Sequence, residues 1–271
     1  MNFSLLMSIY YKEKVKYFNR AMESIWDEQT VKPDEIVLVQ DGKLTDELYY
    51  AIDEWKNKLV GILKIIPLKE NLGLGDALNI GMEHCSYELI ARMDTDDISL
   101  PNRFEKQLNV FKNGNIDICS SWISEFNGDE NENLGYRRLP EMHEEIIKYA
   151  KIRSPINHPA VMYKKSFVLK AGGYKRMIYF EDYYLWVRMI LNKSRFYNLQ
   201  EVLVKMRAGQ GQIERRSGLN YAKNEFILLN EFRKNGFFNS SFEYLRNIIK
   251  IPIRFLPKMV IRIIYYFIRK L

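Results

Sequence analysis

Several features that define other classes of protein are missing from this sequence. Only two cysteines occur among its 271 residues, Cys85 and Cys119, and their spacing suits neither a disulfide framework nor a zinc site. Gly and Pro, with 14 and 8 residues, are too few for a collagen-like, repetitive or disordered chain. The apolar N-terminus lacks the basic residues and the cleavage site of a signal peptide. We therefore expect a globular protein of a reducing compartment that is not exported.

Acidic residues are absent after Glu243. Residues 244–271 carry seven Lys and Arg residues, which account for the whole net charge of +7. Because this excess is confined to one end and is not spread over a folded face, it predicts no nucleic-acid partner.

Long apolar runs are also missing from this basic segment. Its longest uncharged run spans residues 263–268, whereas a membrane-spanning helix needs about 20 apolar residues. Pro252 and Pro257 argue against one continuous helix, although Pro257 can begin a final helix over residues 258–269. The cationic, amphipathic pattern predicts that residues 244–271 lie on an anionic membrane surface. The alternative is a helix packed on the body of the protein or on a second subunit.

Hydrophobic periodicity predicts alternating strands and helices in the first half of the chain. A helix is expected over residues 14–28, with Thr45 as the cap of the next helix and Pro101 in the first turn of a later one. The order βαβαβαβαβ predicts an α/β fold with a mostly parallel, Rossmann-like sheet flanked by helices. The predicted strands are residues 3–9, 35–39, 63–67, 89–93 and 116–120.

Beyond these elements the pattern is less regular. Residues 127–133 form a polar run that predicts a loop, and residues 220–232 predict a helix. No linker rich in Pro, Gly or Ser interrupts the chain, so residues 1–210 are interpreted as one domain. Residues 211–243 form a helical extension, followed by the basic amphipathic segment 244–271.

Ligands of open α/β sheets bind outside the carboxyl ends of the strands, so polar residues just after each predicted strand are candidates. Three such groups occur, at residues 40–42, 71–75 and 94–97. Familiar phosphate-binding motifs do not: Leu78 stands where a dinucleotide fingerprint needs Gly, and no P-loop sequence is present. A Rossmann dehydrogenase and a P-loop enzyme are disfavoured.

Asp94 and Asp96 lie two residues apart in a segment expected to be extended, so their carboxylates can share one hard divalent cation. Mg²⁺ or Mn²⁺ bound by few carboxylates completes its shell with water and phosphate oxygens, which indicates a diphosphate ligand. Arg92 can contact the same phosphates. The alternatives are that the acids decorate a turn, with Asp97 capping the helix after Pro101, and that Arg92 forms only an ion pair.

Five segments together resemble family 2 glycosyltransferases of the GT-A fold. In order they are SLLMSIY (4–10), QDG (40–42), ENLGLG (70–75), ARMDTDD (91–97) and FEDYYLW (180–186). The resemblance covers about residues 3–210 and includes NHP (157–159) and GGY (172–174). It implies a GT-A domain over residues 1–210, with a nucleotide-sugar half at about 1–120 and an acceptor half at about 121–210. Gln40 and Tyr184 depart from the usual Asp-Asp-Gly and Glu-Asp-Tyr-Asp patterns, but the matching Asp41 and Asp182 are present.

The resemblance implies roles for individual residues. Asp94 and Asp96 would bind the metal, with Asp96 the more direct ligand, and Mn²⁺ or Mg²⁺ would neutralise the leaving UDP diphosphate. Asp182 would be the catalytic base of an inverting transfer. The residues implied to bind the UDP-sugar donor are Ser8, Tyr10, Asp41, Asn71, Gly73, Arg92 and Asp94.

Roles near the acceptor or the diphosphate are implied for His158, Glu181 and Arg207. Each has a structural alternative: a core or loop histidine for His158, and a basic solvated loop for Arg207, which with Arg215 and Arg216 flanks residues 209–212. Glu181 and Asp182 precede a helix-like run, where acids favourably meet a helix N-terminus.

The expected function is therefore that of an inverting, metal-dependent glycosyltransferase. It would move galactose or glucose from a UDP-sugar to an undecaprenyl-diphosphate-linked acceptor, such as GlcNAc-diphosphate-undecaprenol, in O-antigen or capsule synthesis. The resemblance and the basic segment place it peripherally at the cytoplasmic face of a bacterial inner membrane, and leave its oligomeric state open. A non-catalytic nucleotide-sugar or membrane-binding module would be favoured if Asp182 faced away from the pocket. A nucleotidyltransferase would need a Gly/Lys/Arg-rich loop after the first strand, where only residues 10–14, YYKEK, stand.

Overall fold

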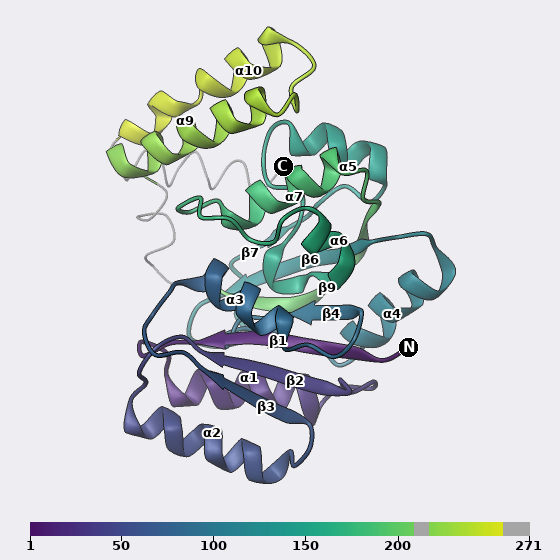
Figure 1. Cartoon of the computed structure of the whole chain (residues 1–271), viewed down its shortest axis with the longest axis vertical. Coiled ribbons are helices and arrows are strands. Elements are labelled where there is room, and N and C mark those ends of the chain that lie inside the picture. Colours follow the sequence, from purple (N-terminus) through teal and green to yellow (C-terminus); the bar gives the residue numbers. More distant parts are fainter. Residues whose placement is uncertain (209–216, 257–271) are drawn as a thin grey trace.

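Four N-terminal strands form the parallel part of one sheet in the computed structural model, which describes residues 1–208 and 217–256 (Figure 1). They pair in the order β3-β2-β1-β4 and lie within one residue of the predicted bounds. The predicted α/β class is thereby confirmed. The strands are β1 (Phe3–Ile9), β2 (Glu35–Gln40), β3 (Leu63–Pro67) and β4 (Leu89–Arg92).

Helices cover both faces of this sheet because successive side chains of each strand point to opposite sides. Leu5 and Met7 of β1 pack with α1, α2 and α4, whereas Leu6 packs with α3 and α7. The bounds of these helices are α1 (Val15–Trp26), α2 (Asp46–Lys58), α3 (Leu74–Glu83), α4 (Arg103–Asn113) and α7 (Glu181–Leu191).

The second half of the sheet is mixed. The predicted strand at 116–120 is β6 (Ile118–Phe126), but a short strand, β8 (Met162–Lys164), lies between β4 and β6 and is antiparallel to both. Because β8 has only three residues, periodicity in the sequence does not reveal it. The other strands are β5 (Ile98–Ser99), β7 (Gly135–Arg137) and β9 (Phe196–Arg207), and β9 runs parallel to β6.

Two predictions about helix starts have different outcomes. The Thr45 hydroxyl accepts a hydrogen bond from the Leu48 backbone N–H at 3.4 Å, so its capping role is confirmed. The placement of Pro101 is wrong, because α4 begins at Arg103 with Asn102 as its N-cap. The Pro101 carbonyl instead accepts a hydrogen bond from the Thr30 N–H at 2.9 Å, which holds it outside the helix.

The helical extension packs on α7. The predicted helix at 220–232 is confirmed as α9 (Leu219–Lys234), and it lies beside α10 (Ser241–Ile248) at the end of the molecule opposite α2 (Figure 1). Leu228 and Phe232 of α9 pack with Tyr184 and Val187 of α7. The remaining helices are α5 (His143–Ala150), η1 (His158–Ala160), α6 (Lys165–Lys170) and η2 (Ile251–Phe255).

Part of the basic segment belongs to this packed layer. The expected boundary between residues 243 and 244 falls inside α10, and Tyr244 and Asn247 are buried. The helix expected over residues 258–269 and the loop with Arg215 and Arg216 lie outside the described residues. Among the helices of residues 1–208 and 217–256, none has the length and apolar character needed to cross a membrane.

Candidate active site

Asp41 joins the turn after β2 to the loop after β3. Its carboxylate accepts hydrogen bonds from the backbone N–H groups of Leu72 at 2.7 Å and Gly73 at 3.1 Å, and from the Asn71 side-chain amide at 2.9 Å. Gly42 has a φ of +85°, and a Cβ there would lie 2.7 Å from the Asn71 nitrogen, so only glycine permits this approach. Asp41 is therefore an anchor that shapes the loop leading into α3.

Ser8 and Tyr10 lie at the carboxyl end of β1, beside this anchored loop. The Asp41 N–H donates to the Ile9 carbonyl at 2.8 Å, which ties the two strand ends together. Tyr10 is exposed and its ring meets that of Tyr11 edge to face, whereas Ser8 is half-buried. The predicted donor-binding residues of β1, β2 and β3 thus share one edge of the sheet.

Arg92 and Asp94 form a two-pronged ion pair at the end of β4. The Arg92 Nη1 donates to Asp94 Oδ2 at 2.6 Å, and Nη2 donates to Oδ1. The Arg92 side chain is only 1% exposed. The ion pair considered as the alternative for Arg92 is therefore present, and it fixes the orientation of the Asp94 carboxylate.

Asp96 and Asp97 follow, near the other carboxylates of Asp94 and Glu13. Burial, helped by the charges of Asp94 and Glu13, raises the pKa of Asp96 to about 7. Burial and the charges of Asp96 and Asp94 raise the pKa of Asp97 well above its usual range. A cation bound near these carboxylates would reduce the electrostatic repulsion among them.

Arg207 at the end of β9 holds this segment from the other side. Its backbone N–H donates to Asp97 Oδ1 at 2.7 Å, and its Nε donates to the Asp96 carbonyl at 3.1 Å. Its guanidinium lies over the rings of Tyr17, at 3.7 Å, and Phe126, at 4.4 Å. Asp97 does not cap α4, whose N-cap is Asn102, so that alternative is wrong.

Glu13 is a member of this cluster that the sequence analysis missed. The Thr95 hydroxyl donates to Glu13 Oε2 at 2.7 Å, which brings the turn after β1 against the acidic segment. Glu13 stands just beyond the end of β1, so the rule that led to the other candidates would also have found it.

The donor set suits a hard divalent cation that a second ligand helps to hold. Within residues 1–208 and 217–256, no group of three or more His, Cys, Asp or Glu side chains is arranged to hold a metal ion. Mg²⁺ and Mn²⁺ nevertheless bind through one or two carboxylates when phosphate oxygens and water complete the shell. The oxygen ligands of Asp94 and Asp96, in surroundings with excess negative charge, fit that pattern.

Tyr174 connects the two halves of the site. Its side chain is buried, and its backbone N–H and carbonyl bind the amide of Asn79 at 2.8 and 2.7 Å. Burial raises the pKa of Tyr174; Arg92 opposes this shift, while the charges of Asp182 and Asp94 add to it. Tyr174 is therefore a common neighbour of the expected base and of the expected metal ligand.

His158 lies behind Tyr174. Its Nε2 is 2.9 Å from the Tyr174 hydroxyl oxygen, and its ring meets Trp186 edge to face. Burial and the nearby Arg92 charge lower the pKa of His158 well below its usual range, so the imidazole is neutral at pH 7. His158 is thus a packed histidine that contacts Tyr174 and Trp186.

Glu181 and Asp182 occupy the first turn of α7, as acids at a helix N-terminus do. This helix end meets the start of α3, because a Cβ on Gly75 would lie 3.6 Å from Glu181 Cγ. Burial, with added effects of Asp182 and Asp76, raises the pKa of Glu181. The start of α7 therefore lies against the start of α3 at these residues.

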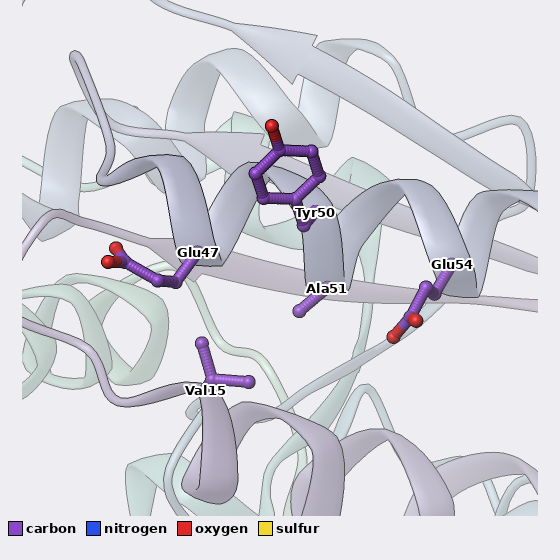
Figure 2. A pocket seen from close by; sticks show the side chains of 5 residues that line it. All are labelled: Val15, Glu47, Tyr50, Ala51 and Glu54. Carbon is purple, nitrogen blue, oxygen red and sulfur yellow. The ribbon is translucent and has the colours of Figure 1, made fainter.

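A hollow elsewhere on the surface is separate from this cluster. It measures about 430 Å³ and is lined by Val15, Glu47, Tyr50, Ala51 and Glu54. Figure 2 shows Val15 of α1 and Ala51 of α2 facing each other, while Glu47 and Glu54 project to either side. None of the predicted site residues lines it, so the candidate active site is the carboxylate cluster.

Comparisons with known proteins agree with this arrangement. A profile described as "Glycosyl transferase family 2" matches residues 4–169. The chain is 39% identical over 257 residues to the UDP-Gal:alpha-D-GlcNAc-diphosphoundecaprenol beta-1,3-galactosyltransferase of Escherichia coli. The matched region covers 94% of this chain and 92% of that protein. It is 38% identical over 267 residues to the amylovoran biosynthesis glycosyltransferase AmsE of Erwinia amylovora, covering 97% of each.

Solved structures show the same fold at low sequence identity. S. aureus TarS 1-349 in complex with UDP-GlcNAc superposes with a TM-score of 0.66 and 19% identity, covering 86% of this chain and 66% of that one. The mannosyltransferase PcManGT from Pyrobaculum calidifontis, in complex with GDP-Man and Mn²⁺, gives a TM-score of 0.63 and 14% identity, covering 93% and 68%. These neighbours are glycosyltransferases of the GT-A fold, which the sequence resemblance predicts.

Proposed function

This chain belongs to glycosyl transferase family 2, and from that premise we propose that it transfers galactose or glucose from a UDP-sugar to a lipid-linked acceptor such as GlcNAc-diphosphate-undecaprenol. The Escherichia coli relative is named for UDP-Gal as the donor and alpha-D-GlcNAc-diphosphoundecaprenol as the acceptor, and its similarity extends over 94% of the chain. The product would be a unit of a bacterial O-antigen or capsule polysaccharide.

The structural observation that carries the proposal is that α7, which begins with Glu181 and Asp182, meets the start of α3 next to the loop that Asp41 holds. The charges of Asp94 and Asp182 also both raise the pKa of the buried Tyr174. An inverting transfer needs a donor diphosphate on one side of the reacting sugar and a proton acceptor on the other. A site that brings the first turn of α7 to the donor-binding edge of the sheet can meet both needs.

On the donor side, the anchored loop at Asn71 and Gly73 and the end of β1 would bind the uracil and ribose. Asp94, oriented by Arg92, and Asp96 would hold Mn²⁺ or Mg²⁺, which when bound neutralises charge on the departing UDP diphosphate. Arg207 lies beside Asp96 and supplies positive charge in the same place.

On the acceptor side, Asp182 would accept the proton of the attacking hydroxyl as its oxygen bonds to C1 of the donor sugar. Inversion at C1 follows from attack on the face opposite the diphosphate. Tyr174, held by Asn79 and His158, would fix the wall between the two substrates. Glu181 neighbours Asp182 in the first turn of α7.

We further propose that the enzyme works peripherally at the cytoplasmic face of the inner membrane. An acceptor joined to undecaprenyl diphosphate stays in the bilayer, so the enzyme must come to it. The basic residues 244–271 supply an attraction for anionic lipid headgroups.

The purified full-length protein can test the transfer reaction directly. It would be incubated with Mn²⁺, a GlcNAc-diphosphate-lipid acceptor and either UDP-Gal or UDP-Glc. We expect one of the two sugars to be transferred, and NMR of the product to show a β linkage formed from the α-linked donor. Transfer with retained configuration would contradict Asp182 as the base, and no transfer from either donor would contradict the substrate assignment.

A further inference from the structure

The layer formed by α9, α10 and η2 has an exposed apolar face. On α10, Phe242, Leu245 and Ile249 are 72%, 52% and 74% exposed and recur at helical spacing. The opposite side of the same helix buries Tyr244 and Asn247. A surface helix of a soluble protein normally keeps its outer side polar, so apolar residues on both sides indicate a second surface to be covered.

A groove between α9 and η2 extends this face. It measures about 410 Å³, and Leu219, Phe226 and Phe255 line it together with Ile248 and Lys223, among others. Ile248, which lines the groove, is the last residue of α10 and is followed by the exposed Ile249, so the groove adjoins the end of the α10 stripe. We call Leu219, Phe226, Phe242, Leu245, Ile249 and Phe255 the docking face.

The charge around the docking face is positive. Residues 217–256 hold six Lys and Arg residues against three Glu. Two of these acids are bound in close ion pairs, Glu225 with Arg254 at 2.8 Å and Glu243 with Lys151 at 2.9 Å. After Leu256 the sequence continues with four more cations and no acid. The layer therefore combines exposed apolar side chains with an excess of positive charge.

We infer that the docking face binds an anionic phospholipid surface, inserting its apolar side chains among the lipid headgroups. Lys223 lines the groove beside Leu219 and Phe226, where it can meet lipid phosphates. A second copy of the chain fits less well, because a symmetric contact would bring two positive faces together. Membrane contact thus extends from residues 244–271 onto the ordered surface of α9.

The docking face also orients the candidate active site. Its helix α9 packs through Phe232 and Leu228 on α7, the helix that carries Asp182 in its first turn. A bilayer bound at this face would therefore hold the acceptor side of the site at a fixed height above the lipid. This consequence rests on the proposed lipid-linked acceptor, whereas the binding itself does not.

Flotation of the full-length protein with vesicles tests the inference. Vesicles of phosphatidylglycerol and phosphatidylethanolamine should carry the wild-type protein to the top of the gradient, whereas pure phosphatidylcholine vesicles should carry much less. The double variant Phe242→Ser/Ile249→Ser should bind the anionic vesicles about tenfold or more weakly, because two exposed apolar side chains no longer insert. The matched control is Tyr50→Ser/Val60→Ser, which changes two exposed apolar residues, 73% and 81% exposed, at the opposite end of the molecule; it should bind like the wild type.

The outcomes separate this inference from the proposed function. Equal vesicle binding by the wild type and the Phe242→Ser/Ile249→Ser variant would overturn the docking face, as would a wild-type protein that is a dimer in solution and a double variant that is a monomer. Transfer to a short soluble acceptor should be the same in both proteins. Its absence in the wild type would count against the proposed function and leave the vesicle result unaffected.

A fluorescence experiment tests insertion itself. Brominated phospholipids should quench the tryptophan fluorescence of a Phe242→Trp variant more strongly than that of the wild type. The fluorescence of a Val60→Trp variant should be quenched no more than that of the wild type. Quenching of Phe242→Trp no stronger than that of Val60→Trp would show that the face stays outside the headgroup layer and would overturn the inference.

Discussion

Arg92 clamps Asp94 with both of its terminal nitrogens, although Arg92 is buried and Asp94 is one-third exposed. A guanidinium inside the sheet thus holds a carboxylate that faces the site. The clamp fixes Asp94 in position and takes up part of its charge. Because Arg92 binds both oxygens of Asp94, we expect Asp96, two residues on, to be the more direct metal ligand.

Replacing Arg92 by Lys should separate the effect of the positive charge from the effect of the two-pronged contact with Asp94. Lysine keeps the positive charge but cannot form the two-pronged pair, so Asp94 loses its fixed orientation. We expect kcat to fall by about tenfold or more and the free energy of unfolding to fall by about 1–3 kcal/mol. Steady-state kinetics and urea unfolding measure the two effects. Lys58→Arg, in the exposed Lys58–Asp27 pair, is the control and should leave both near wild type.

Replacing Asp96 by Asn should abolish metal-dependent transfer and leave the fold intact. Burial and the Asp94 charge raise the pKa of Asp96 to about 7, so its ionised form opposes folding as the pH rises through that value. At pH 8 the variant should therefore unfold at no lower urea concentration than the wild type, while its transfer rate falls to the level of wild type in excess chelator. Full turnover of the wild type in excess chelator would contradict a metal role.

Asp182→Asn tests the base against the alternative of a simple helix-end acid. The variant keeps the size of the side chain and loses its ability to accept a proton. We expect kcat to fall by about 10² or more with nearly unchanged affinity for the UDP-sugar. Glu181→Gln changes a neighbouring acid in the same helical turn and should lower kcat much less. Similar small losses in both variants would show that the two acids serve only the N-terminus of α7.

His158 should make the stability of the protein depend on pH. Burial, together with the Arg92 charge, lowers the pKa of His158 in the folded protein, so below about pH 6.5 the unfolded chain takes up a proton that the folded chain does not. The free energy of unfolding should therefore fall as the pH falls from 6.5 to 5. The His158→Gln side chain can still bond to Tyr174. The free energy of unfolding of this variant should fall by up to about 1.4 kcal/mol less per pH unit than that of the wild type. Parallel pH profiles from urea unfolding would contradict a neutral, buried His158.

The sequence was most informative where one regular pattern determines the structure. The parallel strands β1 to β4 have strong apolar patterns. The acids stand just after these strands, and a parallel sheet brings such strand ends to one edge. The sequence could not reveal β8, because three residues carry no period. It also could not show that Arg92 turns inward to Asp94, since a surface arginine and a buried one look alike in sequence.

Contacts between distant segments were hidden for the same reason. Tyr174 stands in the GGY motif, yet its backbone contacts with Asn79 of α3 and its hydroxyl contact with His158 join segments far apart in the sequence. Glu13 reaches Thr95 only because the turn after β1 folds over the end of β4. The apolar residues of α10 indicated a membrane segment, but not that Tyr244 faces the body while Phe242 faces outward.

The buried side of α10 predicts where the chain can be shortened. The Tyr244 hydroxyl donates to Asn230 at 2.7 Å, and the Asn247 amide donates to the Lys151 carbonyl at 2.9 Å, so α10 is attached to both α9 and the end of α5. A protein ending at residue 256 should keep the urea-unfolding curve and the UDP-sugar binding of the full chain, while binding anionic vesicles more weakly because four cations are gone. A protein ending at residue 243 should be less stable by about 2–4 kcal/mol or fail to stay soluble, since it loses the buried Tyr244 and exposes Phe232 and Phe237. If both shortened proteins unfold at the urea concentration of the full chain, α10 is a separable anchor, and the layer it forms with α9 does not support the α7 helix that carries Asp182.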